Sequence, residues 1–175
     1  MRAPDDARPD QPVVPFSDLM SKVGNFLFYW SNLEKALTDA IREARSDADR
    51  PSGRVVGTFS ERLNVWSELT TRLPGNDNKA ELVDQIARQA LSLRDIRNTI
   101  VHGLMGGNSM PDTGPGHIEC AVGGYDKPTG ETVRYSMDDL EHFAQAIDAC
   151  RRGLRDGDSF NFNLHSRFRG GRDTE

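Results

Sequence analysis

The stretch LRDIRNTIVHGLMGG, residues 93–107, holds several side chains suited to phosphate and proton chemistry close together. Arg94 and Arg97 carry guanidinium groups, which are permanently charged forks that match the oxygens of a phosphate. His102 carries an imidazole, which takes or gives a proton near neutral pH. Asn98 adds an amide able to orient either a phosphate or the imidazole. These residue types together favour phosphoryl chemistry.

The spacing of these residues predicts that they share one side of a helix. With Arg97 as the origin and about 100° per residue, Arg94 falls at about 60°, Asn98 at about 100° and His102 at about 140°. Asn98 and His102 can approach each other because they are one turn apart, while Arg97 borders Val101, whose apolar neighbours restrain the guanidinium. The apolar side chains occupy a separate sector, at about 260° to 340°: Leu82, Ile86, Leu93, Ile96, Ile100 and Leu104.

Such a polar edge suits the cleavage of RNA, because ribose supplies its own nucleophile. The 2'-hydroxyl attacks the adjacent phosphate, so a protein needs to position the chain, move protons and stabilise the extra negative charge. That reaction requires neither a metal ion nor a cofactor. In this scheme His102 exchanges protons, Arg97 stabilises the phosphate charge and Asn98 supports one or the other.

Apolar periodicity predicts a mainly α fold, a bundle of about four helices with a β-hairpin inserted before the last helix. The third helix is expected to begin near Asn76 and to end among Gly103, Gly106 and Gly107. Alternating residues around DKPTG predict the hairpin at about residues 116–136. The expected core stripes of the first, second and fourth helices are Leu19, Val23, Phe26, Trp30, Leu33, Leu37 and Ile41; Phe59, Leu63, Trp66, Leu69 and Leu73; and Leu140, Phe143, Ile147, Cys150 and Leu154.

Two capping boxes mark helix starts. Thr58 with Glu61 precedes the second helix, and Ser136 with Asp139 precedes the fourth. In each pair the first side chain can accept from a backbone N–H at the helix start while the carboxylate reaches back to the N–H of its partner.

Length and composition indicate one domain with polar ends. The 175 residues suit one globular domain at 16–155, preceded by a disordered segment at 1–15 and followed by a mobile tail at 156–175. No signal peptide or membrane-spanning run is evident, and the two cysteines form no CxxC pair, so a cytoplasmic protein without a membrane partner is expected. The net charge of -5 disfavours a general nucleic-acid coat protein.

The consecutive Arg97 and Asn98, followed by His102, resemble the signature of the HEPN superfamily, and FYWSNLEKAL resembles the first helix of bacterial HEPN proteins. The likeness covers residues 16–155. It implies a helical bundle that dimerises, brings two motif helices into one cleft and cleaves RNA without a metal, as a toxin or defence effector with an antitoxin or regulatory partner. Arg97, Asn98 and His102 are then the catalytic residues, and Arg94 binds substrate outside the core motif.

Other interpretations stay open at this point. The chain is alternatively a non-catalytic HEPN-like module that binds a nucleotide or a protein, or a purely structural dimerisation domain. Cys120 and Cys150 are expected to point into the core rather than to bind a metal. Phe28 or Tyr29 is a candidate for a dimer contact, whereas Phe26 and Trp30 belong to the core stripe.

Overall fold

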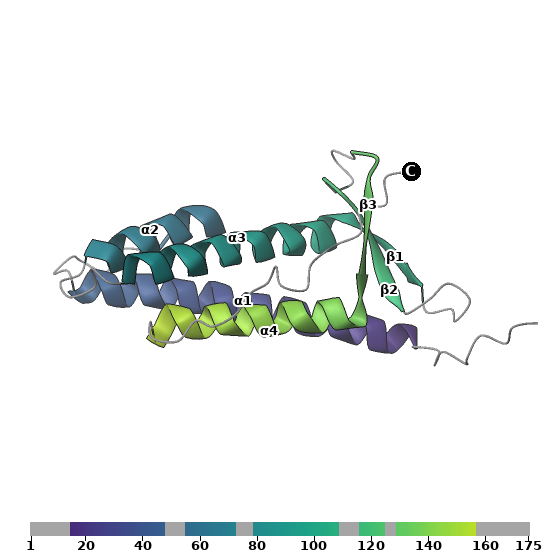
Figure 1. The fold of residues 1–175 in the computed structure, drawn as a ribbon, viewed down its shortest axis with the longest axis horizontal. Helices are drawn as coiled ribbons and strands as arrows, with labels where there is room; N and C mark the ends of the chain where they lie inside the picture. The colour runs from purple at the N-terminus through teal and green to yellow at the C-terminus, as the bar shows by residue number, and fades with distance from the viewer. Residues whose placement is uncertain (1–14, 48–54, 73–78, 109–115, 125–128, 157–175) are drawn as a thin grey trace, which may run out of the picture.

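The computed structural model describes residues 15–47, 55–72, 79–108, 116–124 and 129–156, which form a helical bundle with a small sheet at one end (Figure 1). The expected mainly α architecture is therefore confirmed. Its elements are α1 (Phe16–Asp47), α2 (Phe59–Arg72), α3 (Ala80–Gly103), β1 (Leu104–Asn108), β2 (His117–Ala121), β3 (Thr132–Ser136) and α4 (Met137–Asp156). The amino-terminal segment up to residue 14, the tail from residue 157 and the predicted helix start at Asn76 lie outside the described residues.

The bundle core is built from the apolar stripes of the helices. α1 and α3 each pack against both α2 and α4. All seven stripe residues predicted for α1 are buried, and so are the five predicted for α4. Trp30 of α1 meets Phe59 of α2 with ring centroids 4.7 Å apart, and Phe26 meets Phe143 of α4 at 6.1 Å. Burial of these large rings is the main source of hydrophobic stabilisation.

Both predicted capping boxes form. Thr58 N–H donates to Glu61 Oε2 over 2.7 Å, and Glu61 N–H donates to Thr58 Oγ1 over 3.3 Å. Ser136 N–H donates to Asp139 Oδ2 over 2.8 Å, and Asp139 N–H donates to Ser136 Oγ over 3.1 Å. The Thr58 backbone N–H lowers the pKa of Glu61, because it stabilises the carboxylate. These boxes fix where α2 and α4 begin.

The sheet is larger than the predicted hairpin. β2 and β3 pair antiparallel as expected, with Glu119 opposite Arg134. A third strand, β1, adds to β2 with a bulge between Leu104 and Gly106, which gives the order β1-β2-β3. The sequence pattern missed β1, because the glycine-rich segment lacks the alternation of apolar and polar residues that marks a strand.

The placement of Leu104 on the helical stripe of α3 is wrong. The helix ends at Gly103, and Leu104 is the first residue of β1, paired with Cys120. A Cβ at Gly103 would lie 2.2 Å from the carbonyl oxygen of Ala121 at the end of β2. The β1–β2 pairing then gives the backbone of residues 104–108 the hydrogen bonds that another helical turn would have supplied.

Gly103→Ala should lower the free energy of unfolding by about 1 to 3 kcal/mol, because the methyl group forces the helix end away from β2. Gly24→Ala is the matched control, since Gly24 also lies in a helix but a Cβ there meets no atom within 4 Å. That control should stabilise the protein by about 0.5 to 1 kcal/mol. Urea unfolding monitored by circular dichroism measures both values, and equal effects of the two substitutions would contradict the packing described.

Candidate functional site

The predicted site residues lie on the last turns of α3, just before the chain enters the sheet. Asn98 and His102 are exposed to solvent, while Arg94 and Arg97 are half-buried. Ile100, on the other side of the helix, is 1% exposed and belongs to the core. The helix therefore presents the polar residues on one side and buries its apolar stripe on the other, as the sequence pattern indicates.

The guanidinium of Arg97 has an incomplete set of partners. Its Nη1 donates to Asn98 Oδ1 over 3.1 Å, so the consecutive residues of the motif are joined directly. Its Nε is buried and has no hydrogen-bond partner within the described part of the chain. No carboxylate of the described residues forms an ion pair with Arg97. A half-buried cation left in this state favours an incoming anion, because an unpaired buried donor carries a desolvation cost.

Most other described arginines are ion-paired with a carboxylate. They are Arg42, Arg62, Arg72, Arg88, Arg94, Arg134, Arg151 and Arg152. Arg155 has no carboxylate partner among the described residues either, but it is exposed at the end of α4. Arg97 thus combines partial burial with a charge that no described carboxylate pairs, which makes it a candidate for binding an anion.

Arg94 has a different environment. Its Nε and Nη2 donate to Asp95 Oδ1 over 3.0 Å and 2.6 Å, and its Nη1 donates to Ser60 Oγ at the start of α2. These contacts neutralise the guanidinium and fix α3 against α2. The assignment of Arg94 to substrate binding stays a prediction, with a carboxylate already competing for its charge.

His102 lies at the surface near the end of α3. Its side chain is exposed, and the described residues offer it neither a hydrogen bond nor an ion pair. The expected approach of Asn98 to His102 is not a hydrogen bond in the structure, because Asn98 Oδ1 accepts from Arg97 instead. The backbone of His102 contacts Gly124, in the turn that follows β2.

An apolar shelf adjoins this polar edge, because α2 is too short to cover the whole bundle. α2 has 14 residues, against 32 in α1 and 24 in α3, and it covers only the half of the bundle away from the sheet (Figure 1). α2 lies on the side of α1 that carries Glu34 and Thr38, both of which Arg62 contacts. Helical periodicity places the remaining apolar side chains of α1 and α3 on that same side, towards the sheet; we define them as the apolar shelf, Phe16, Met20, Leu27 and Val101.

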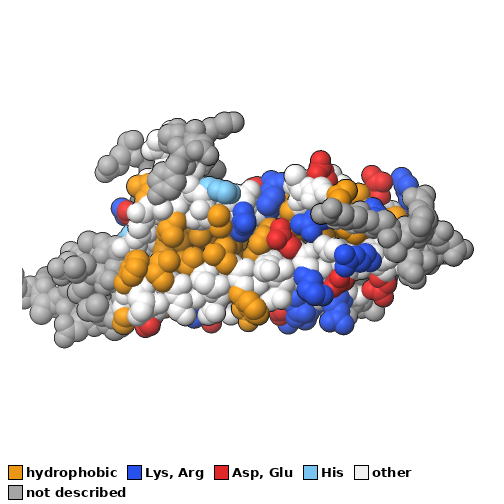
Figure 2. All heavy atoms as spheres, turned by 180° about the vertical axis from the view of Figure 1, so that it is seen from behind, with side chains coloured by type: hydrophobic (Ala, Val, Ile, Leu, Met, Phe, Trp, Pro, Cys, Tyr) orange, Lys and Arg blue, Asp and Glu red, His pale blue; other side chains and the backbone are white. Residues whose placement is uncertain are grey.

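The shelf is open to solvent. Phe16 is 52% exposed and Val101 is 41% exposed, and Met105, the second residue of β1, is 52% exposed. Figure 2 shows a continuous hydrophobic surface at the end of the molecule that carries the sheet, bordered by basic side chains. One feature of the sequence indicates this surface. Val101 is apolar, yet on the helical wheel it falls between the polar residues Arg97 and Asn98. Exposed apolar patches of this kind mark interaction surfaces.

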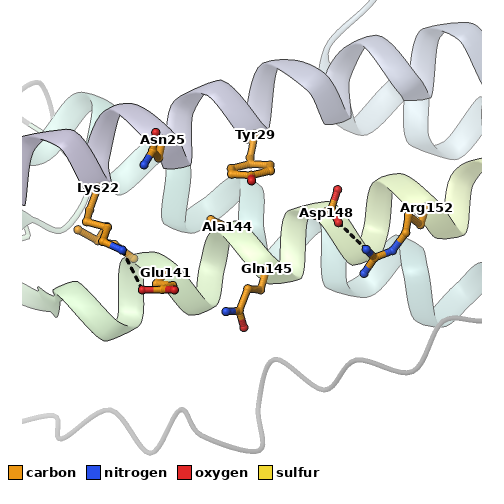
Figure 3. Close-up of a pocket in the computed structure, with 9 residues that line it drawn as sticks. Lys22, Asn25, Tyr29, Glu141, Ala144, Gln145, Asp148 and Arg152 are labelled. Carbon is orange, nitrogen blue, oxygen red and sulfur yellow. Dashed lines mark hydrogen bonds and ion pairs between the residues drawn. The ribbon is translucent and has the colours of Figure 1, made fainter.

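A second concavity lies between α1 and α4, where a groove of about 550 Å³ is lined by Tyr29 and polar residues (Figure 3). Its charges are already neutralised. Lys22 Nζ lies 2.8 Å from Glu141 Oε2, and Arg152 Nη1 lies 2.6 Å from Asp148 Oδ2. The groove is the better-defined concavity. The edge of α3 carries the exposed imidazole of His102 and the guanidinium of Arg97, which pairs with no described carboxylate, so we take it as the candidate site.

The cysteines are core residues, as expected. Cys120 and Cys150 are each 0% exposed. Within the described ranges, no group of three or more His, Cys, Asp or Glu side chains is placed to share a metal ion. On the sheet, Arg134 Nε donates to Glu119 Oε1 over 2.8 Å, and this contact lowers the pKa of Glu119.

Comparison with known proteins adds no relative. No family model matches the chain, and no curated protein or solved structure matches it significantly. None of the described helices is apolar over a length that would cross a bilayer.

Two buried thiols and one buried phenol should lower the free energy of unfolding at high pH. Burial raises the pKa of Cys120 to about 11, and those of Cys150 and Tyr135 to about 12, from ordinary values of 9.0 for the thiols and 10.0 for the phenol. The unfolded chain therefore loses these protons at lower pH than the folded chain. Ionisation of these three groups should leave the free energy of unfolding unchanged below about pH 9 and lower it between about pH 9 and 12, by roughly 1.4 kcal/mol per pH unit for each group in its window.

Urea unfolding at a series of pH values measures this slope. The Cys120→Ala, Cys150→Ala double variant is the control, since removing both thiols should flatten the part of the curve between pH 9 and 10. An identical slope in the double variant would show that the thiols are not the source of the alkaline loss.

Proposed function

We propose that this protein is a HEPN-type, metal-independent endoribonuclease whose site is formed by Arg97, Asn98 and His102. The single observation that carries the proposal is the half-buried Arg97 guanidinium, which has a buried Nε without a partner and no carboxylate beside it. An RNA phosphate supplies the acceptor oxygens and the negative charge that this group lacks. The exposed His102 stands one to two turns further along the same helix, where it can reach the ribose or the leaving oxygen.

The proposed reaction uses the nucleophile of the substrate. The 2'-oxygen forms a bond to phosphorus as an imidazole accepts its proton, and the bond from phosphorus to the 5'-oxygen breaks as that oxygen receives a proton. The products are a 2',3'-cyclic phosphate and a 5'-hydroxyl. Arg97 stabilises the charge that gathers on the phosphate oxygens in the transition state, and Asn98 holds Arg97 through the contact with Nη1.

A second copy of the chain completes the proposed site. The apolar shelf lies beside Arg97, so a two-fold contact through it would bury Val101 and Phe16 and place two motif helices side by side. Two His102 side chains in one cleft would then allow one imidazole to accept a proton and the other to donate one. Phe28, which is 65% exposed on α1, is a further candidate for a contact between the two copies.

The HEPN assignment itself is part of the proposal. It is supported by the four-helix bundle and by the position of the motif at the end of the third helix. A cytoplasmic toxin or defence role, controlled by an antitoxin or another regulatory partner, follows from that assignment. An activity of this kind requires neutralisation, and a partner that covered the apolar shelf in place of the second copy would block the proposed shared site.

His102→Ala and Arg97→Ala should each abolish or strongly reduce RNA cleavage, by at least about 100-fold, because proton transfer and phosphate stabilisation each contribute at that scale. Purified protein is incubated with mixed RNAs in a metal chelator, and cyclic-phosphate ends are quantified. Arg88→Ala is the matched control, since Arg88 lies on the same helix but pairs with Asp84 over 2.7 Å. Its cleavage rate should equal that of the unsubstituted protein.

Full cleavage by the His102→Ala variant would overturn the catalytic assignment. Binding of RNA without scission by the unsubstituted protein would favour the non-catalytic module instead, and loss of that binding in Arg97→Ala would keep the anion site while rejecting the nuclease.

Val101→Glu should convert the dimer to a monomer, because a charge in the centre of an apolar contact is buried without a partner. Sedimentation equilibrium should report a mass that falls from about twice to once 19.5 kDa. Cleavage should fall with it, because the site is shared. Val56→Glu serves as control, since Val56 is 68% exposed just before α2, away from the shelf. A dimer that survives Val101→Glu would reject this interface.

A further inference from the structure

The turn after β2 lies against the last turn of α3, at His102. Gly124 is buried in this turn, and a Cβ built on it would lie 3.1 Å from both the Cβ and the carbonyl oxygen of His102. The backbone of Gly124 has a φ of +74°, in the left-handed region that glycine adopts without strain. Because Gly124 has no side chain, the backbone can adopt this conformation without strain and can also lie close to His102.

The described residues of this turn, 122–124, are hydrogen-bonded to the ends of the neighbouring strands. Gly124 N–H donates to Ala121 O over 3.3 Å, and Val122 N–H donates to Glu131 O over 2.9 Å across the hairpin. Ala121 itself contacts the helix end at Gly103. The strands behind the turn are anchored in the core through Ile118 and Cys120, which are both 0% exposed.

A second contact joins the sheet to α3. Tyr135 of β3 is hydrogen-bonded through its side chain to Thr99, which follows Asn98 directly. Tyr135 is 5% exposed and packs against Phe143 of α4, with ring centroids 5.4 Å apart. The sheet therefore contacts α3 at two levels, at Thr99 and at His102, and both contacts lead back to the core.

These contacts matter because nothing else among the described residues fixes the imidazole. His102 has no hydrogen-bond partner within them, and an exposed helical histidine exchanges between the side-chain rotamers that the preceding turn allows. A neighbour packed on its Cβ and its carbonyl restricts both the rotamer and the position of the helix end. Catalysis depends on such restriction, since a displacement of about 1 Å costs about 100-fold in rate.

We infer that the turn after β2 is the positioning element of His102, and that Gly124 is the residue through which it acts. The inference rests on the proposed function for its effect on catalysis, but the positioning itself concerns only the fold. It also assigns a role to the hairpin, which aligns the proton-transferring residue at the edge of the site.

Gly124→Ala tests this inference, with Gly130→Ala as the matched control. Gly130 belongs to the same hairpin and has a φ of +84°, but a Cβ there meets no atom within 4 Å. Both variants therefore acquire similar backbone strain, of about 1 to 2 kcal/mol, and only Gly124→Ala adds a methyl group against His102. Circular dichroism and urea unfolding establish that both variants are folded.

Two readouts separate positioning from general destabilisation. The ring-proton signals of His102, assigned by their loss in His102→Ala, should shift in the NMR spectrum of Gly124→Ala and stay in place in Gly130→Ala. The kcat for RNA cleavage should fall about 10- to 100-fold in Gly124→Ala with KM unchanged, and should stay within about two-fold in Gly130→Ala.

The NMR arm decides the inference even if the unsubstituted protein cleaves no RNA. Unshifted His102 signals in folded Gly124→Ala would overturn the positioning role, and so would equal shifts in the two variants. Shifted signals with unchanged kcat in an active enzyme would also overturn it, because His102 would then move without consequence. Absence of cleavage in every variant, including the unsubstituted protein, would reject the proposed function and leave the NMR result as the measure of the contact.

Discussion

The backbone contact between Gly103 and Ala121 is the constraint on which the rest of the structure depends. The carbonyl of Ala121 approaches so closely that no side chain fits at Gly103. The helix therefore ends there and the chain continues at once as β1, which pairs with β2. Because the site residues occupy the last turns of α3, this junction also determines what surrounds them. It brings the hairpin turn against His102 and places the sheet beside the open end of the bundle.

The short α2 has the second structural consequence. A longer helix would have covered the apolar side chains of α1 and α3 near the sheet, and the bundle would have closed around them. Because α2 begins at the level of Trp30 and Arg94, it does not cover the apolar shelf, which stays at the surface next to the polar edge. An exposed apolar shelf and an uncompensated guanidinium side by side are both unfavourable for an isolated chain. A dimer that binds RNA removes both costs, which is why we favour it over a surface with no function.

Ion pairing with carboxylates distinguishes Arg62 and Arg94 from Arg97. Arg62 contacts Glu34 and Thr38 and connects α2 to α1, while Arg94 pairs with Asp95 and connects α3 to α2. Arg97 lies on the same face of the same helix as Arg94, but among the described residues its guanidinium is hydrogen-bonded only to the neighbouring Asn98. Residue type and helical phase are similar for the two, so their difference comes from what the fold brings next to them.

The sequence by itself determined the mainly helical fold, the buried stripes of α1 and α4, the two capping boxes and the separation of the polar residues of α3 from its apolar ones. All of these follow from local periodicity and from hydrogen bonds between residues close in the chain, which a single sequence displays directly. Only the tertiary structure decided that β1 follows α3 directly, that Arg94 is neutralised while Arg97 is not, and that Gly124 lies against His102. Each of these depends on atoms brought together from distant parts of the chain, and no local pattern records which backbone will approach which.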